Sequence, residues 1–561
     1  MEINNKRIGV FFCTCNGKVT EKVNYDLITS EVKKLPQVEY IGESQDLCSL
    51  TEKEIICRNI REKKLNRIVI VGCVKSKQER QFRELMKEAG ANPHLLFLSD
   101  IIEECCNVHE KGTLCTSKAL EMVKMAVARA GKLEEVNYDN VPVNRKVLVI
   151  GGGLAGIETA LESAARGLKV ILIEKEDKLG GRLARVNTIF GTDRIPAFLL
   201  EDKIGAVNSN SDIEVKTNTQ LTDVNGNIGD FTAWLKTDEI ETKVKVGAIV
   251  VAIGVQTIFC PVKYGLGIAE NVIGQMKLER LLAEGKNFKN KRISMVVGRS
   301  TEAFTLPFIM ALKNALLLRK KFEATVNLFF TNMKVSGDNW EKLYTDARVS
   351  GVNFFKFDNT VEISLSQGQI TVCYEDPFIK GKVPGSYQIV SDYVVLQEEL
   401  VPAEGTEELA GILRIEQQPS GFMSVDNAHI LRENTCRDGI YLVGSCQYPG
   451  FVNEIEMSAK TIAQEVSRRF NGEQVSVELT QPYVDAAKCV VCLTCYRCCP
   501  HGAITIEHGE DYQNLYRSSA RMNPLACRRC GICAAECPGK AIQMPGFTDD
   551  QILTQLEAME V

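Results

Sequence analysis

Eight cysteines near the C-terminus repeat one spacing twice. Each run reads C-x2-C-x2-C-x3-C-P and ends at Pro500 or Pro538. Three thiolates on one short loop can reach three irons of a cubic cluster, and in this spacing the fourth thiol ligates the neighbouring cluster. A zinc ribbon needs only two C-x2-C pairs and has no use for the remaining thiols. We therefore predict two 4Fe-4S clusters, one on Cys489, Cys492, Cys495 and Cys537, the second on Cys527, Cys530, Cys533 and Cys499.

Short strand-forming segments follow both runs, at 502–506 and 539–543, as an internal repeat would have them. The doubled run resembles the two-cluster ferredoxins of bacteria. This resemblance implies an α+β ferredoxin domain over residues 476–561. Val491 and Thr494 stand where ferredoxins often have glycine, and Cys498 is a ninth thiol beside a predicted ligand.

A glycine-rich turn follows an apolar strand at 146–150. The segment 151–156 fits G-x-G-x-x-G, in which glycine lets a pyrophosphate approach the backbone N–H groups at a helix N-terminus. A second apolar strand at 169–173 ends at Glu174, placed to bond ribose hydroxyls. A purely structural glycine turn would not need strand, turn, helix, strand and acid in this register, so the sequence predicts a dinucleotide site.

Three later segments indicate which dinucleotide binds. They are Leu179-Gly180-Gly181-Arg182 and the apolar strands at 247–254 and 439–445. Their set and order resemble the two-dinucleotide-binding-domain flavoproteins of the thioredoxin reductase type, which bind FAD, and imply such a core over residues 146–475. Ser445 stands where that family usually has aspartate. The implied cofactor contacts are Gly151, Gly153, Ala155, Gly156, Glu174, Lys175, Gly181, Arg182, Gly254, Gly444 and Ser445.

The nicotinamide-binding module of that family is degenerate here, over residues 265–435. Its strand at 292–298 continues into Arg299 and Ser300 without the glycine fingerprint. A fold can persist after its cofactor site is lost. We therefore expect no direct reduction by NADH or NADPH, so electrons enter and leave by clusters or through a partner protein.

The first 132 residues predict a small parallel α/β domain. Strands are expected at 8–12, 38–41, 67–71 and 95–98, with helices at 51–64 and 78–90. Thiols follow each strand, and the carboxyl edge of a parallel sheet is where loops converge on a ligand. Buried thiols without metal are the alternative. We predict a third 4Fe-4S cluster on Cys15, Cys48, Cys73 and Cys105, with Cys115 as an alternative ligand.

Composition limits the functional classes. The chain has 561 residues, 45% of them hydrophobic, a formal net charge of −5, and an odd number of cysteines, 21. Scattered basic residues argue against a nucleic-acid partner, and no signal sequence or membrane-length apolar run is visible, which favours the cytoplasm. Neither a Ser/His/Asp set nor a carboxylate pair is apparent. Cys57, Cys260, Cys373 and Cys436 read as structural, while Cys446 reads as a core thiol or a redox thiol.

Taken together, these segments resemble the A-type subunits of the heterodisulfide reductase family over nearly the whole length. The resemblance rests on 8–15, the Cys48 and Cys73 turns, 103–109, 149–182, 444–447 and the ferredoxin end. It implies an oxidoreductase with FAD and several 4Fe-4S clusters. The implied partners are B- and C-like subunits and a hydrogenase- or dehydrogenase-type donor in an anaerobic hetero-oligomer, with free ferredoxin as a further partner.

Two departures leave the function open. Longer family members insert a second ferredoxin after a segment like 225–231, whereas this chain returns at once to the strand region 244–254. The family's paired-cysteine motif is replaced by residues 191–196. At least one exit for electrons is therefore missing or replaced. The chain either bifurcates electron pairs at its flavin or relays electrons between partner subunits.

Overall fold

The computed structural model forms two compact units. One comprises residues 1–140, 476–499 and 503–561, and the other comprises 141–475 with 500–502. The structure describes residues 6–190, 194–264, 269–298, 305–358, 361–366, 369–375, 387–429, 433–507 and 518–559. Within these ranges no helix combines the length and the apolar character needed to cross a membrane.

The N-terminal sheet is parallel, with the order β2-β1-β3-β4. The predicted strands are confirmed as β1 (Ile8–Cys13), β2 (Val38–Ser44), β3 (Arg67–Val71) and β4 (Leu96–Ser99). Apolar residues on opposite faces of β1 and β3 belong to two separate cores. One core includes α1 (Tyr25–Val32) and α4 (Thr113–Lys132), and the other includes α2 (Leu50–Glu62) and α3 (Lys75–Glu88). Such two-sided burial explains the uninterrupted apolar run of β1.

The ferredoxin part is built as two interleaved halves. Strand β25 (Tyr483–Val484), before the first cysteine run, pairs with β28 (Ile542–Gln543), after the second. Strand β26 (Ile504–Glu507), after the first run, pairs with β27 (Ser519–Met522), before the second. Helices α12 (Thr494–Cys498) and α13 (Ile532–Ala535) each contain the third cysteine of a run. This exchange of strands carries the end of each run toward the other half.

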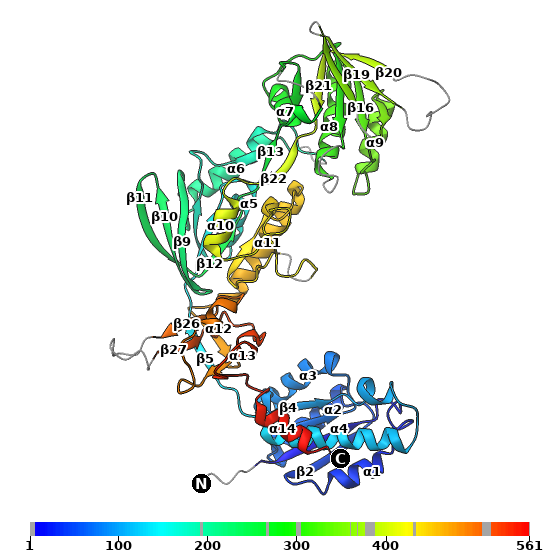
Figure 1. Cartoon of the computed structure of the whole chain (residues 1–561), viewed down its shortest axis with the longest axis vertical. Coiled ribbons are helices and arrows are strands. Elements are labelled where there is room, and N and C mark those ends of the chain that lie inside the picture. Colours follow the sequence, from blue (N-terminus) through cyan, green and yellow to red (C-terminus); the bar gives the residue numbers. More distant parts are fainter. Residues whose placement is uncertain are drawn as a thin grey trace. The chain divides into compact units, whose positions relative to one another are not determined.

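The last helix, α14 (Asp549–Glu557), lies along α4 in the same unit (Figure 1). Its N-cap Thr548 and Gln551 form a capping box. Arg129 of α4 donates a 2.6 Å hydrogen bond to Gln555, and Lys132 forms an ion pair with Asp550 at 2.9 Å. The C-terminus is thereby attached to the N-terminal domain.

The second unit begins with a five-stranded parallel sheet in the order β23-β12-β6-β7-β8. Helices α5 (Leu154–Ala164), α6 (Pro196–Ser209) and α11 (Val452–Arg469) accompany it. An antiparallel meander of β9 (Thr219–Asn227), β10 (Asp230–Thr237) and β11 (Ile240–Val246) precedes β12. The sheet strands are β6 (Lys146–Ile150), β7 (Lys169–Ile173), β8 (Ile213–Lys216), β12 (Ala248–Val251) and β23 (Ile440–Leu442).

A second parallel sheet, in the order β14-β21-β15-β16-β17, forms the nicotinamide-type part of this unit. Its core includes residues of α7 (Gln275–Ala283), α8 (Leu306–Phe322) and α9 (Trp340–Val349). The predicted strand at 292–298 is β15 (Arg292–Val297), whereas Arg299 and Ser300 lie outside the described residues. The other strands are β14 (Val272–Gly274), β16 (Thr325–Phe330), β17 (Asn353–Lys356) and β21 (Tyr393–Leu396).

Smaller elements complete both units. An antiparallel sheet joins β18 (Glu362–Ser366), β19 (Gln369–Tyr374) and β20 (Tyr387–Ser391), and β13 (Val255–Ile258) pairs with β22 (Glu399–Pro402). Helix α10 (Thr406–Leu413) and strands β5 (Tyr138–Pro142) and β24 (Gln474–Glu478) are the remaining regular segments.

Candidate cofactor sites

The turn between β6 and α5 needs glycine for two different reasons. A Cβ at Gly151, whose φ is +111°, would lie 2.5 Å from the carbonyl oxygen of Ala252, and one at Gly156 would lie 1.8 Å from the carbonyl oxygen of Gly151. These two glycines are required by the fold itself. A Cβ at Gly153 would meet only the Cα of Gly181, at 4.0 Å. The protein leaves that position open, at the N-cap of α5, where a pyrophosphate would approach.

Glu174 at the end of β7 is held by the turn. Its buried carboxylate accepts hydrogen bonds from the backbone N–H groups of Gly152 at 2.6 Å and Glu176 at 2.9 Å. The acid therefore fixes the turn geometry, and its bonding to a ribose stays a prediction. The neighbouring Lys175 is differently placed, because it forms an ion pair with Glu404 at 3.7 Å and is absent from the pocket lining.

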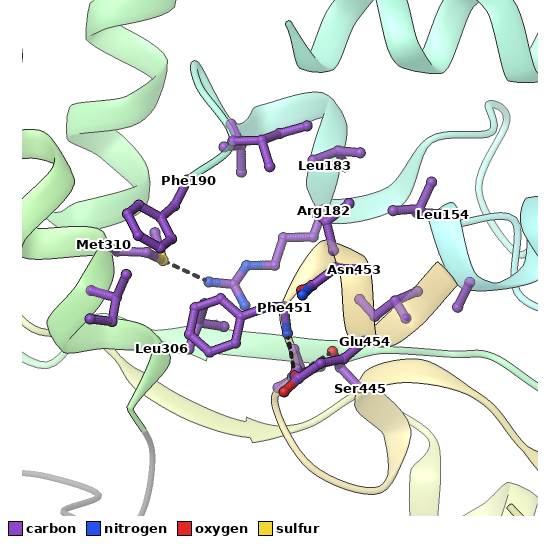
Figure 2. Close-up of a pocket in the computed structure, with 18 of the residues that line it drawn as sticks. Leu154, Arg182, Leu183, Phe190, Leu306, Met310, Ser445, Phe451, Asn453 and Glu454 are labelled. Atoms are coloured by element: carbon purple, nitrogen blue, oxygen red, sulfur yellow. Dashed lines mark hydrogen bonds between the residues drawn. The ribbon is translucent and has the colours of Figure 1, made fainter. Parts of the chain in front are cut away.

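A pocket of about 520 Å³ opens beside this turn (Figure 2). Two of the predicted contacts, Gly181 and Gly444, do not line this pocket but lie against residues that do. A Cβ at Gly181 would be 3.0 Å from the Cα of Gly153, and a Cβ at Gly444 would be 2.8 Å from the Cβ of Ala155. Both have positive φ, so glycine suits them. Of the predicted contacts, those lining the pocket are Gly153, Ala155, Arg182, Gly254 and Ser445.

The rest of the pocket wall comes from residues that the sequence did not single out. Figure 2 shows Phe190, Leu306, Met310 and Phe451 around the space into which Arg182 extends. Phe451 packs against Trp340 of α9 with ring centroids 5.0 Å apart. These side chains come from segments far apart in the chain, so no local pattern reveals them. Together they form an apolar wall of the kind that surrounds a flat aromatic ligand.

A buried ion pair borders the pocket. The ammonium of Lys313, on α8, lies 2.5 Å from the carboxylate of Glu279 and donates a 2.8 Å hydrogen bond to the carbonyl of Thr188. Burial lowers the pKa of Lys313, while the negative charge of Glu279 and its hydrogen bond raise that pKa. Glu279 also accepts a hydrogen bond from the backbone N–H of Asn187. The pair therefore ties α7 and α8 to the loop after Arg182.

Ser445 and Cys446 differ in role. The Ser445 hydroxyl lines the pocket and accepts a 3.3 Å hydrogen bond from the backbone N–H of Gly450. The thiol of Cys446 is buried and donates to the carbonyl of Val251 at 3.3 Å. Burial raises the pKa of Cys446 to about 12, which favours the core thiol over the redox thiol.

The ferredoxin thiols form two groups, each drawn from both runs. A small cavity is bordered by Cys489, Cys492, Cys495 and Cys537. In the other group, burial raises the pKa of Cys533 to about 12, and Cys527, Cys499 and Cys530 add to that rise, followed by Cys495 of the first group. The grouping follows the spacing argument, and ligation by these eight thiols remains a prediction. Burial raises the pKa of the Cys498 thiol, and the nearby thiols Cys499 and Cys530 raise it further.

Left-handed backbone occurs at matching positions of the two runs. Val491 and Leu493 have φ of +51° and +64°, and their counterparts Arg529 and Gly531 have +58° and +79°. The glycine-like position of the first run is thus Leu493 rather than Thr494, which begins α12. A β-branched valine in this conformation is strained.

Three thiols of the N-terminal domain come together at the carboxyl edge of its sheet. The sulfur atoms of Cys13, Cys15 and Cys73 lie within 4.8 Å of one another, and those of Cys13 and Cys15 are 3.3 Å apart. Gly72 allows this approach, because a Cβ there would lie 2.4 Å from the carbonyl oxygen of Cys13. Such a buried cluster of soft ligands suits iron or another thiophilic metal.

The other two predicted ligands are not among the sulfur atoms within 4.8 Å of one another, although Cys48 is near enough to Cys13 for that thiol to raise its pKa. The sulfur of Cys48 is 2.7 Å from a carboxylate oxygen of Asp46, and that of Cys105 is 3.8 Å from the sulfur of Cys115. The structure therefore brings together Cys15 and Cys73 of the predicted set, and adds Cys13, the last residue of β1. The ligand set of this third site stays a prediction.

Comparison with known proteins supports two of these sites. Residues 145–300 match the family model of pyridine nucleotide-disulphide oxidoreductases, and residues 481–538 match that of 4Fe-4S dicluster domains. These matches fall where the sequence predicts the FAD-binding and two-cluster domains, and they confirm the predicted α/β fold class with its ferredoxin end.

Relatives are similar over almost the entire chain. An iron-sulfur subunit (A 2) of the CoB--CoM heterodisulfide reductase of Methanopyrus kandleri is 28% identical over 606 residues, which cover 89% of this chain and 91% of that protein. The A-type subunit of the H(2):CoB-CoM heterodisulfide,ferredoxin reductase of Methanothermobacter thermautotrophicus is 28% identical over 98% of this chain and 97% of its own. Among solved structures, T. acidophilum thioredoxin reductase covers 58% of this chain and 100% of its own, with 15% identity and a TM-score of 0.42.

The open space at Gly153 generates a prediction. Gly153→Val should leave the fold intact, because the backbone there has φ −75° and an added Cβ meets no protein atom closer than 4.0 Å. FAD content should fall to about a tenth or less, because the side chain would occupy the pyrophosphate position. Flavin absorbance per chain and a thermal unfolding curve measure the two effects. Gly205→Val is the matched control, since a Cβ at Gly205 on α6 also meets open space, away from the turn. Stoichiometric FAD in Gly153→Val would place the cofactor elsewhere.

Proposed function

We propose, from the place of this oxidoreductase in the family of A-type heterodisulfide reductase subunits, that the chain moves electrons between a bound FAD and its 4Fe-4S clusters. The observation that carries the proposal is the presence in one chain of a dinucleotide pocket with an apolar wall and two groups of four thiols. Bound FAD accepts two electrons together whereas each cluster carries one, so joining them turns pairwise transfer into a one-electron relay. We assign the domains as 1–132, 146–475 and 476–561.

The residues of the pocket fit this cofactor. The open N-cap at Gly153 leaves room for a pyrophosphate, and Gly254 and Ser445 border the same space. Phe190 and Phe451 line the pocket and would exclude water from a bound flavin ring. Lys313 and Glu279 hold α7 and α8 against that wall. The protein's part is thus binding, orientation and exclusion of water.

A third cluster in the N-terminal domain is part of the proposal. Buried thiolates need a cation in place of water, and Cys13, Cys15 and Cys73 converge in a domain with no lysine or arginine bound to them in the described hydrogen bonds and ion pairs. Two ligand sets fit this site. One is Cys15, Cys48, Cys73 and Cys105, from the sequence, and the other replaces Cys105 by Cys13.

The relatives' names make them subunits of heterodisulfide reductases, one of which also carries H(2) and ferredoxin in its name. We infer that this chain likewise works in an anaerobic, cytoplasmic hetero-oligomer. Its partners would be B- and C-like subunits and a hydrogenase- or dehydrogenase-type donor, with free ferredoxin as a further partner.

This function has two candidate forms. In the first the flavin bifurcates electron pairs, and in the second it only relays electrons between partner subunits. The relay is favoured by one observation: where longer family members insert a ferredoxin, β9 and β10 are joined by a tight hairpin in which Asn227 pairs with Asp230. With the intact complex and two acceptors of different potential, bifurcation requires that both are reduced together in fixed proportion. Full reduction of one acceptor alone at an unchanged rate would identify the relay.

Cofactor content tests the proposal as a whole. Purified without oxygen, the chain should carry one FAD and about twelve irons, because three cubic clusters each hold four. Flavin absorbance after denaturation and a colorimetric iron assay give both numbers. About eight irons would remove the N-terminal cluster, and a chain without flavin would remove the function.

Single cysteine variants test the N-terminal ligands. Cys73→Ser should lose about four irons of the twelve while FAD stays bound, because Cys73 belongs to both candidate sets. Cys13→Ser and Cys105→Ser then separate the sets, since only the true ligand should lower the iron content. Cys57→Ser is the control, because Cys57 lies within α2 and donates to the carbonyl of Leu85. Unchanged iron in Cys73→Ser would show that the site holds no cluster.

Nicotinamide should not reduce this flavin directly. The strand β15 ends at Gly298, whose backbone N–H already donates a 2.6 Å hydrogen bond to the side chain of Gln397 and so is not offered to a pyrophosphate. Mixed anaerobically with NADH or NADPH, the isolated chain should show little bleaching of its flavin absorbance within seconds. A low-potential chemical reductant should bleach it promptly. Saturable, rapid bleaching by NADH would contradict the prediction.

A further inference from the structure

Arg182 extends into the pocket without a direct ion-pair partner among the described residues. Its side chain crosses the pocket (Figure 2), and its terminal nitrogen lies 3.7 Å from the sulfur of Met276 and 3.6 Å from that of Met310. Thioether sulfurs are weak acceptors and bear no charge. In the described part of the chain, no carboxylate is within ion-pair distance of this guanidinium.

The nearest carboxylates already bind other groups of the protein. Glu279 is bound to Lys313 at 2.5 Å, and the carboxylate of Glu398 accepts a hydrogen bond from the backbone N–H of Met276 at 2.9 Å. Burial raises the pKa of Glu398 and lowers that of Arg182, and their opposite charges offset these shifts only in part, because the two groups form no direct ion pair. A cation in such surroundings is stabilised when a ligand brings negative charge to it.

The position of the guanidinium indicates which part of a bound dinucleotide it would contact. The backbone of residue 181 lies against Gly153, at the end of the pocket suited to the pyrophosphate. The guanidinium itself is carried away from that end to Met310 on α8, whose neighbours Leu306 and Ile309 also line the pocket. Apolar side chains there suit a flat ring rather than a phosphate.

We propose that Arg182 is a positioning residue that faces the flavin ring and favours its reduced form. The oxidised ring is neutral, whereas uptake of two electrons and one proton leaves it with one negative charge at neutral pH. A fixed cation beside the ring therefore stabilises the reduced form more than the oxidised form and raises the midpoint potential. This inference rests on the proposed FAD site.

The experiment compares binding of both redox forms. In Arg182→Gln, affinity for reduced FAD should fall at least about tenfold more than affinity for oxidised FAD, which lowers the two-electron midpoint potential by about 30 mV for each factor of ten. Arg182→Met, which matches the methionines around it, gives the same readout if the glutamine variant is unstable. Arg182→Lys should restore part of the shift. Arg185→Gln is the matched control, because Arg185 is an exposed cation of the same short helix, Gly181–Arg185, and does not line the pocket.

Each outcome has one meaning. Equal weakening of both redox forms with an unchanged potential would assign Arg182 to the pyrophosphate and overturn the proposal. An unchanged potential with unchanged affinity would also overturn it, as would an equal shift in Arg185→Gln, which would show a general charge effect. Wild-type chain without stoichiometric FAD would overturn the proposed function itself, whereas normal wild-type flavin with no shift in the Arg182 variants refutes this inference alone.

Discussion

Desolvation constrains both kinds of candidate cofactor site. Burial raises the pKa of the Cys533 and Cys105 thiols to about 12 each, so at neutral pH they stay protonated unless a cation takes the place of water. For Arg182, burial disfavours the positive charge and lowers the pKa of the guanidinium, and no acid forms an ion pair with it in the described part of the chain. Buried groups of either sign are tolerated when a counter-charge arrives. Clustered thiols therefore suit iron, and the guanidinium suits an anionic ligand.

The same backbone feature brings these groups together in two sheets, the N-terminal sheet and the sheet that contains β6 and β12. In each, neighbouring parallel strands must approach closely where they end, and a glycine with positive φ makes this possible. A Cβ at Gly72 would strike the carbonyl oxygen of Cys13 at 2.4 Å, and one at Gly151 would strike that of Ala252 at 2.5 Å. The first contact places Cys13 beside Cys73, and the second shapes the turn before α5. Convergence of loops at the carboxyl edge then follows from parallel topology.

Sequence reasoning succeeds here where the chemistry is encoded locally. The repeated cysteine spacing predicts two groups of ferredoxin thiols, and the apolar runs predicted β6, β7, β12 and β23 of the first dinucleotide-type sheet and β15 of the second. It fails where tertiary packing decides. The choice between Cys13 and Cys105 depends on side-chain direction at a strand end, and the pocket wall of Phe190, Trp340 and Phe451 joins three distant segments. Leu493 rather than Thr494 takes the left-handed backbone, a position that Gly531 of the second run also marks in the sequence.

The hairpin between β9 and β10 is packed into the core of its unit. Ile228, in the hairpin between β9 and β10, is buried, and a Cβ added to Gly439 would lie 2.7 Å from its Cβ. Arg437 donates a 2.7 Å hydrogen bond to the carbonyl of Gly226 in the same hairpin. Glycine at 226 is required as well, because a Cβ there would lie 2.2 Å from the carbonyl oxygen of Asp230. The hairpin is thus closely packed against the segment that leads to Ser445, and the conformation of its turn depends on glycine at 226.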